Sequence, residues 1–446
     1  MKKVFYLIAT ALMAFTASCS DESPESQLFD VKVQLSVPAD VKEMSLDQIS
    51  VSLAQGEKVF NATTEASGIA TFTVPAGIYS ASASATHIVE GNAYYALNGV
   101  KENVIVDKTW NSDKPLALEL VASKTSQVII KEVYTGGTTN PETQNAENTD
   151  NYLTLYNNSP VAVNLKNFGL AYSQNNANAP TTGFLERGEL TYANEDWIPA
   201  SDGTFYFPSD LTIEPYTDVV VVLRSAINHT LTNTASVDLS HADYVCYDPE
   251  SGYNDANTYK APSANIPTNH YLKAVKWGMM AYLFYSNQTP AFFIYQTPDG
   301  QTPKDYFADA SLDVLPSPYL VVYKAKKISR SWILDAVDTY DIAFPADCYK
   351  RMTPDLDAGF VYNAYAKGYS MYRNVNKAAT EAIAANKGKL VYDYALGTQD
   401  IENGSTDKSG IDAEASIKNG AKIVYMDTNN STNDFHLRKE CAQRTK

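Results

Sequence analysis

Side chains that could hold a metal ion are sparse in this sequence. Five histidines are scattered along the chain, and the closest group of ligand-type residues is Asp238, His241, Asp243 and Cys246. Metal ligands must converge on one point, and alternate residues of a strand face opposite sides, so only His241 and Asp243 would share a face. An isolated histidine on a polar loop is the simpler interpretation. We therefore predict no metal site and no cofactor.

Motifs of the common hydrolases and nucleotide-binding enzymes are missing as well. The sequence has no phosphate-binding Gly-rich loop, no Gly-x-Ser-x-Gly motif and no His-Glu-x-x-His motif. Paired acids such as Glu186 with Glu189, and Glu195 with Asp196, lie in loop-like sequence, whereas a glycosidase must hold two carboxyl groups about 5–10 Å apart. We interpret them as surface acids and predict no catalytic residue and no enzymatic activity. A hydrolase with an unrecognised site remains an alternative.

Aromatic side chains are the remaining candidates for ligand contacts, because the chain contains 31 tyrosines. Tyr192 and Trp197 lie among polar residues, where they could stack on a sugar or another planar ligand. Trp277 lies in an apolar run, which favours core packing instead. We therefore name Tyr192 and Trp197 as the predicted ligand-binding residues.

The first residues have the pattern of a targeting signal. Lys2 and Lys3 form a charged region, and the apolar stretch 4–15 is too short to span a bilayer. Small residues then precede Cys19, which is the arrangement that a lipoprotein signal peptidase requires. We predict a signal peptide at 1–18, lipidation of Cys19 and anchoring to the outer membrane through the acyl chains.

A short acidic tract follows the predicted lipidation site. Residues 20–23 read Ser-Asp-Glu-Ser, which resembles the surface-export signal of Bacteroidetes lipoproteins. We expect residues 19–27 to form a tether and the rest of the chain to face the cell exterior.

The net charge of −16 argues against nucleic-acid binding, because that requires a basic face. An acidic surface suits cationic ligands or, more simply, keeps the chain soluble.

The other cysteines are Cys246, Cys348 and Cys441, an odd number at wide spacing without a Cys-x-x-Cys pair. This pattern does not fit a disulfide framework. We predict three buried free thiols, with one bridge and one remaining thiol as the alternative.

Alternation of apolar and polar residues predicts strands in the first part of the chain. The clearest strand is 29–37, followed by 48–53, 59–62, 69–74 and 78–85, with a last strand near residue 120. Six or seven short strands predict a β-sandwich over 28–122. Residues 64–68 predict a turn into the strand at 69–74. The run from Thr64 to Tyr79 resembles transthyretin-like and carboxypeptidase-regulatory-like modules, and the resemblance implies a spacer or docking module without catalytic residues.

A second β unit is expected over 126–446. Strands are predicted at 127–134, 151–159, 161–170, 219–223 and 332–337, and a closing segment spans 426–435. This succession resembles the lamin-tail domain, although Lys131, Thr154 and Phe168 replace the Asn, Glu and Trp of that pattern. The resemblance implies a fold that is mainly β, with two consecutive Ig-like β-sandwiches. Loop and helical insertions enlarge the second one.

The segments between those strands are expected to supply core and contacts. Apolar runs at 277–285, 292–295 and 319–323 predict buried segments. Alanine-rich residues 376–386 predict a helix that Gly388 stops. Binding is expected on the long polar loops 135–151, 172–202 and 247–270.

The whole arrangement resembles a Bacteroidetes lipoprotein family, domain of unknown function 4876. The resemblance implies an association with outer-membrane transport. Our leading hypothesis is a non-enzymatic surface lipoprotein that captures a nutrient ligand or docks on a TonB-dependent transporter. The alternative is a structural or adhesive surface protein that binds protein or glycan. An effect of deletion on attachment, with nutrient uptake unchanged, would favour the alternative.

Overall fold

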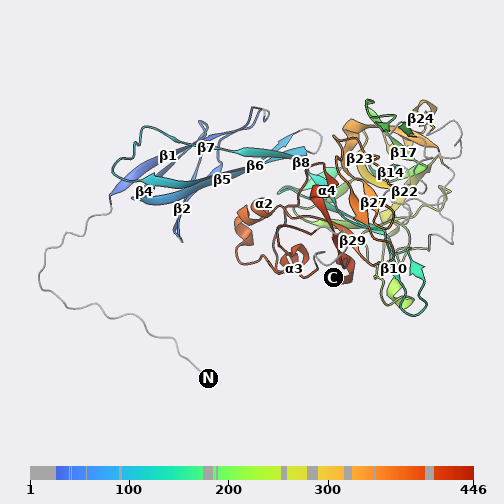
Figure 1. Ribbon diagram of the computed structural model, residues 1–446. Helices are drawn as coiled ribbons and strands as arrows, with labels where there is room; N and C mark the ends of the chain where they lie inside the picture. The colour runs from blue at the N-terminus through green and yellow to red at the C-terminus, as the bar shows by residue number, and fades with distance from the viewer. Residues whose placement is uncertain are drawn as a thin grey trace, which may run out of the picture. The chain divides into compact units, whose positions relative to one another are not determined.

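The computed structural model describes most of the chain. The described residues are 27–39, 41, 43–56, 58–89, 93–173, 184–186, 189–252, 259–278, 290–315, 324–345, 348–396 and 406–445. Contacts divide the chain into two compact units (Figure 1): one falls within residues 1–85 and 98–121, and the other within 86–97 and 122–446.

Two sheets make up the strands of the first part of the chain, blue to cyan in Figure 1. The first sheet has the order β4 (Ile69–Pro75), β1 (Leu28–Ser36) and β7 (Leu116–Glu119). The second has the order β3 (Lys58–Thr63), β2 (Ser50–Gln55), β5 (Gly77–Val89), β6 (Ala93–Val106) and β8 (Val121–Ser126). The strands expected from alternation are therefore present, and β6 and β8 are additional strands.

Alternation buries one face of each of these sheets. On β1, Phe29, Val31, Val33 and Leu35 are buried, while most of the residues between them are exposed or half-buried. The predicted turn between β3 and β4 is also present. Gly68 has a φ of +75°, a left-handed conformation that glycine adopts without strain, and its N–H donates to the carbonyl of Glu65 at 2.8 Å.

One large mixed sheet dominates the second unit. Among the described residues, eleven strands follow the spatial order β26 (Ile333–Val337), β23 (Ala291–Gln296), β14 (Phe168–Ser173), β18 (Gly203–Tyr206), β22 (Tyr271–Lys276), β21 (Tyr244–Cys246), β20 (Asp218–Val222), β12 (Tyr152–Asn157), β9 (Val128–Tyr134), β29 (Ser370–Arg373) and β30 (Phe435–Arg438). Strand β21 pairs in parallel with β20 and β22, and the other neighbours are antiparallel.

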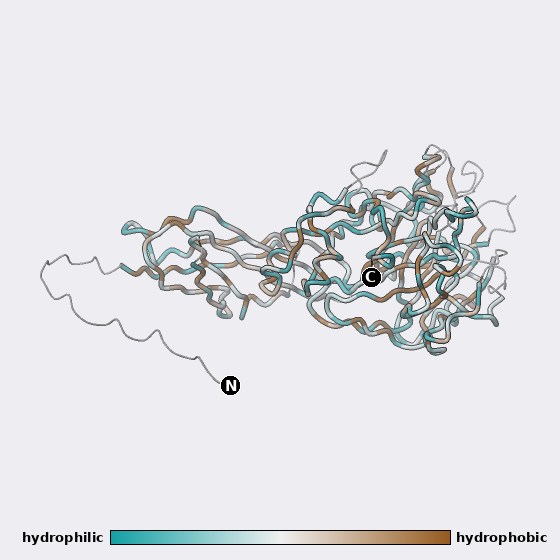
Figure 2. The backbone as a smooth tube through the Cα atoms, turned by 90° about the horizontal axis from the view of Figure 1, so that it is seen from below, coloured by the Kyte–Doolittle hydropathy of each residue, from teal (hydrophilic) through white to brown (hydrophobic). Residues whose placement is uncertain are grey.

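The large sheet curls on itself. Strands β26 and β9 lie near opposite ends of the strand order, yet the Asp335 carboxylate on β26 accepts a hydrogen bond from the N–H of Ile130 on β9 at 2.6 Å. The curled sheet encloses an apolar core to which both ends contribute, for example Val133, Ile294 and Leu437. Figure 2 shows hydrophobic stretches of the backbone in brown and hydrophilic stretches in teal. The mainly β, sandwich-like architecture expected from the sequence is confirmed.

Small sheets and short helices surround the large sheet. The sheets are β13 (Val163–Leu165) with β19 (Leu211–Ile213), β17 (Trp197–Ser201) with β25 (Ala325–Ser329) and β24 (Asp313–Val314), β27 (Thr339–Asp341) with β28 (Val361–Asn363), β10 (Thr138–Thr139) with β11 (Ala146–Glu147), and β15 (Leu185–Glu186) with β16 (Glu189–Leu190). The α-helices are α1 (Pro303–Phe307), α2 (Lys377–Ala382), α3 (Ala413–Lys418), α4 (Ser431–Asp434) and α5 (Ala442–Thr445). Short 3-10 turns include η5 (Arg330–Trp332) and η7 (Ala384–Asn386).

Two predicted elements are divided in the structure. The strand expected at 161–170 becomes β13 and β14, which belong to different sheets, because Asn167 between them takes a left-handed φ of 49°. The helix expected at 376–386 ends at Ala382, since Ile383 has an extended backbone and α2 is followed by the separate turn η7. Local composition favours helix here, but tertiary contacts of the following residues interrupt it.

Several predicted segments lie outside the described residues. They are the signal peptide, Cys19 and nearly all of the tether, residues 279–285 of one apolar run, and residues 319–323. In the part of the chain that the structure describes, no helix is long and apolar enough to cross a membrane.

Candidate functional site

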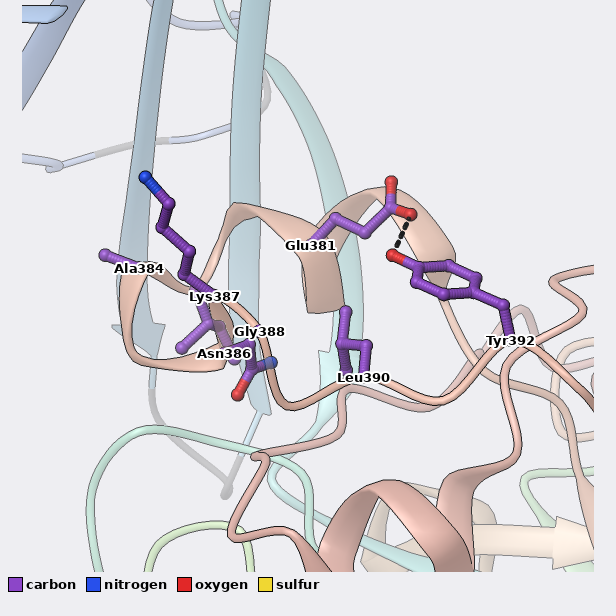
Figure 3. A pocket seen from close by; sticks show the side chains of 8 residues that line it. Glu381, Ala384, Asn386, Lys387, Gly388, Leu390 and Tyr392 are labelled. Carbon is purple, nitrogen blue, oxygen red and sulfur yellow. Dashed lines mark hydrogen bonds between the residues drawn. The ribbon is translucent and has the colours of Figure 1, made fainter. Parts of the chain in front are cut away.

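A surface pocket of about 490 Å³ lies beside α2 and η7 (Figure 3). Its lining includes Glu381, Ile383, Asn386, Lys387, Leu390 and Tyr392. The volume falls within the range of roughly 300–1,000 Å³ that is typical of small-molecule sites. The pocket is distinct from the three loops on which binding was expected.

Local sequence explains the backbone around this pocket. The Asn376 side chain caps α2 by accepting a hydrogen bond from the N–H of Ala379 at 3.1 Å. After η7, Gly388 takes a φ of +76°, which reverses the chain and brings the following segment back along the helix. Tyr392 on this segment therefore lies opposite Glu381 on the helix (Figure 3).

Asn386 holds the pocket wall in place. Its side-chain amide donates to the carbonyls of Thr380 at 2.8 Å and Lys422 at 2.7 Å, and its oxygen accepts from the N–H of Lys422 at 2.8 Å. Thr380 adds two hydrogen bonds with the backbone of Val424. The wall is thus tied to residues more than 30 positions away in the sequence.

The chemical groups of the pocket form one polar pair and one aromatic surface. The Tyr392 hydroxyl donates to Glu381 Oε1 at 2.8 Å, and this bond to a carboxylate raises the pKa of Tyr392. The Tyr392 side chain is 54% exposed, and the Lys377 ammonium lies 5.6 Å from its ring centroid. Lys387 is exposed at the rim. This arrangement can stack on an apolar ring face while offering a hydrogen-bond acceptor and a cation.

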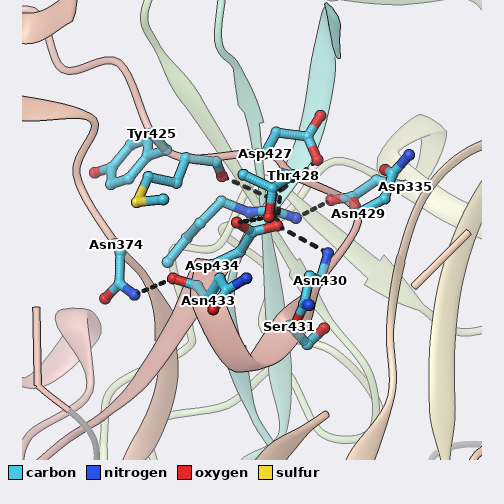
Figure 4. A network of polar contacts seen from close by, with 12 residues as sticks. Asp335, Asn374, Tyr425, Asp427, Thr428, Asn429, Asn430, Ser431, Asn433 and Asp434 are labelled. Atoms are coloured by element: carbon cyan, nitrogen blue, oxygen red, sulfur yellow. Dashed lines mark hydrogen bonds and ion pairs between the residues drawn. The ribbon is translucent and has the colours of Figure 1, made fainter. Parts of the chain in front are cut away.

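The charged groups inside the second unit contact one another instead. Arg373 on β29 makes ion pairs with Asp335 at 2.5 Å, Asp427 at 3.3 Å and Asp434 at 3.8 Å (Figure 4). Its guanidinium also donates to the backbone carbonyls of Ile130 at 2.9 Å and Met426 at 2.8 Å. Burial raises the pKa of Asp335 to about 7 despite the adjacent Arg373. These groups connect strands β9, β26 and β29 with the closing segment 426–435. We therefore assign them a structural role.

A second buried network surrounds Lys131. Strand β12 pairs Thr154 with Glu132 and Leu155 with Ile130, so Lys131 is the extra residue of a β-bulge. Its ammonium contacts Asp218 at 2.6 Å and Glu414 at 2.8 Å. Burial alone would lower the pKa of Lys131, but these carboxylates outweigh it and hold the pKa well above its ordinary value. Three tyrosine rings complete the cage, those of Tyr156, Tyr372 and Tyr425.

Glu132 and the closing segment 426–435 are also built into this interior. Glu132 accepts hydrogen bonds from the Tyr152 hydroxyl at 2.9 Å and from the N–H of Ala442 at 2.8 Å. The closing turn is capped by Asp434, whose carboxylate accepts from the N–H and hydroxyl of Thr428, both at 2.8 Å. Both therefore contribute to the core and its closure.

The two predicted ligand-binding residues occupy different environments. Tyr192 is fully buried in an apolar cluster, and its hydroxyl donates to the carbonyl of Arg351 at 2.6 Å. It does not present an exposed stacking face, because neighbouring strands cover it. Trp197 is half-buried, its ring centroid lies 5.8 Å from that of Tyr192, and the Lys327 ammonium lies 4.9 Å from its ring. Ligand binding at Trp197 remains a prediction.

The other candidate chemistry from the sequence does not converge. No group of three or more His, Cys, Asp or Glu suited to a metal ion occurs within the described residues. Asp243 accepts a hydrogen bond from the N–H of Val220, while Cys246 is buried in the core. Glu186 and Glu189 are paired in the backbone register of the β15–β16 hairpin.

The three cysteines of the body are free thiols. Cys246 and Cys441 are buried as predicted, but Cys348 is only half-buried, since it lies near the exposed Phe344.

The sequence did not point to the pocket residues Glu381 and Tyr392. The criterion used for Tyr192, an aromatic residue among polar neighbours, does not find Tyr392, because Leu390 and Val391 directly precede it in the sequence.

Comparisons with known proteins show a similarity to one family. Residues 214–408 match the model of a family described as a protein of unknown function, DUF4876. The structure is similar to that of a DUF4876 family protein from Bacteroides thetaiotaomicron VPI-5482, with a TM-score of 0.61 and 20% identity over 91% of this chain and 94% of that chain. No match was found among curated proteins. The resemblance to this family is confirmed, while the Ig-like, lamin-tail-like and carboxypeptidase-regulatory-like assignments remain predictions.

Proposed function

We propose that this chain, which is similar to DUF4876 proteins, is a surface-exposed outer-membrane lipoprotein that captures a nutrient for a TonB-dependent transporter without catalysing a reaction. The observation that carries the proposal is the arrangement at the N-terminus. A charged start, a short apolar stretch and small residues lead directly to Cys19, and an acidic tract follows. Such a chain would be held at the membrane by its acyl chains.

The pocket supports a binding role. Glu381, Lys387 and Tyr392 line it from the surface and are exposed to solvent, so a ligand can reach them without a rearrangement of the core. The buried charges of Arg373 and Lys131, in contrast, contact protein carboxylates and stabilise the fold. A rigid β scaffold with an accessible polar pocket fits capture of a ligand.

The transport part of the proposal is tested by gentle immunoprecipitation of the full-length, lipidated chain from outer membranes. Mass spectrometry would then identify the co-purifying proteins. A matched pull-down uses an unrelated outer-membrane lipoprotein with the same tag from the same cells. Repeated recovery of a TonB-dependent transporter with this chain alone supports the proposal. If no transporter is recovered in repeated experiments and a deletion strain has an attachment defect, the transport role is rejected and an adhesive role is favoured.

A further inference from the structure

The charge around the pocket differs from the charge of the whole chain. The net charge of the sequence is −16. At the pocket, however, Lys387 is part of the lining and the Lys377 ammonium lies over the Tyr392 ring. Two lysines, Lys377 and Lys387, therefore accompany the single lining carboxylate of Glu381, which favours an anionic ligand.

The lining also has an amphipathic character. The exposed ring of Tyr392 and the half-buried side chains of Ile383 and Leu390 supply apolar surface. Glu381 Oε1 is occupied by the Tyr392 hydroxyl, whereas within the described residues its second carboxylate oxygen makes no hydrogen bond. That oxygen can accept from a ligand hydroxyl. A ligand that matches all these groups has an apolar face, hydroxyl groups and a negative charge.

The polar pair is oriented before any ligand arrives. Asn386 ties the wall to Lys422 through hydrogen bonds of 2.7 and 2.8 Å, and Glu381 holds the Tyr392 hydroxyl at 2.8 Å (Figure 3). Side chains that are already held in position lose less conformational entropy on binding. The pocket is therefore better suited to one defined small ring than to a flexible chain.

We propose that this pocket binds an acidic saccharide, in which a pyranose ring carries a carboxylate. The ring would stack on Tyr392, a ring hydroxyl would donate to the second oxygen of Glu381, and the carboxylate would pair with the Lys387 ammonium. The inference rests on the proposed function, because it names the class of nutrient that the lipoprotein captures.

The test is a titration of the purified full-length chain in detergent with methyl glycosides, followed by calorimetry or ligand-observed NMR. A panel of methyl uronides, those of galacturonic, glucuronic and mannuronic acid, is compared with the corresponding neutral hexosides. We expect at least one uronide to bind about tenfold more tightly than its neutral counterpart, as one charge-assisted contact allows. Equal affinity for both members of every pair, or no binding of any sugar at millimolar concentration, would overturn the proposal.

Two variants assign the contacts. Tyr392→Ala should remove binding of the uronide and of the neutral sugar, whereas Lys387→Gln should remove the preference for the uronide and leave the weaker neutral binding. Phe344→Ala and Lys166→Gln are matched controls, because both side chains are exposed at other places in the second unit. Full uronide affinity in Tyr392→Ala, or an unchanged preference in Lys387→Gln, would contradict the assigned contacts. Circular dichroism verifies that each variant is folded.

The outcome is independent of the transporter experiment. Sugar binding by the purified chain without a co-purifying transporter would retain the site and reject the transport role. A co-purifying transporter without any sugar binding would retain the transport role and reject the acidic saccharide.

Discussion

At the scale of single residues, the interior of the second unit depends on cations that face more than one carboxylate. Arg373 contacts Asp335, Asp427 and Asp434, and its side chain is almost completely buried. Removing such a cation leaves buried negative charge without compensation, which is more costly than the loss of the pair itself. These residues therefore set the stability of the curled sheet.

The first prediction concerns this cation. Arg373→Met should lower the free energy of unfolding by roughly 3–5 kcal/mol, because carboxylates inside the protein lose their partner. Urea denaturation monitored by fluorescence measures the change. The control is Lys273→Ala, whose ion pair with Asp248 at 3.3 Å has a lysine side chain that is 47% exposed. That variant should lose at most about 1 kcal/mol, and a comparable loss in both variants would refute the assignment.

The second prediction concerns pH. Burial raises the pKa of Asp335 to about 7 from its ordinary value of 3.8, so between these values the folded chain holds a proton that the unfolded chain releases. The stabilising contribution of the protonated Asp335 is complete below about pH 4 and is lost as the pH rises through 7. Asp335→Asn cannot ionise. The free energy of unfolding of the wild type minus that of the variant should therefore decrease from pH 4 to 7.

Chemical denaturation at a series of pH values from 4 to 8 measures this difference. The comparison with Asp335→Asn removes the contributions of other titrating groups, such as His436, whose pKa burial lowers to about 3. A difference that increases over the window would show that Arg373 holds Asp335 ionised instead.

At the scale of elements, α2 and η7 form the pocket because tertiary contacts interrupt a sequence that favours one continuous helix. Ile383 is extended, and the buried amide of Asn386 replaces helical hydrogen bonds by contacts to Thr380 and Lys422. The interruption places Glu381 and Tyr392 opposite each other. The pocket is thus a consequence of how the end of the helix is tied down.

The third prediction follows from this arrangement. Asn386→Ala removes three hydrogen bonds to the backbone of Thr380 and Lys422, each worth about 0.5–1.5 kcal/mol. Hydrogen–deuterium exchange should accelerate over 380–390 and 420–424, while strands such as β23 keep their protection. Asn419→Ala, which removes one longer bond of 3.3 Å to the carbonyl of Lys389, is the control. Unchanged exchange in Asn386→Ala would mean that the wall is held by other contacts.

At the scale of the whole molecule, the chain consists of two β units that follow a predicted lipid anchor. The fourth prediction is that Cys19→Ala prevents acylation, so that the protein no longer incorporates labelled palmitate and moves from the detergent phase to the aqueous phase of a Triton X-114 partition. Cys348→Ser is the control, because that half-buried cysteine lies in the body. Retention of the label in Cys19→Ala would place the modification elsewhere.

Much of the fold follows from local pattern. Strict alternation over 29–37 predicted β1, and the Gly68 turn, β9, β20, β23 and β26 occur close to where the sequence placed them. A two-residue period specifies which face of a strand is buried, and this information lies within a few neighbouring residues. The division of 161–170 at Asn167 was missed because a single left-handed residue leaves the apolar pattern unchanged.

The candidate site was decided by tertiary structure. Tyr192 lies among polar residues in the sequence and Tyr392 follows the apolar residues Leu390 and Val391, yet packing buries Tyr192 and leaves Tyr392 exposed. Arg373 reaches Ile130 across 243 residues, and the curl of the sheet that brings them together has no local signature. The sequence alone determined most of the strands, the acidic balance and the targeting pattern, because these depend on composition and short-range periodicity. Which side chains meet, and which remain open to a ligand, depends on contacts between distant segments, and only the folded chain brings those segments together.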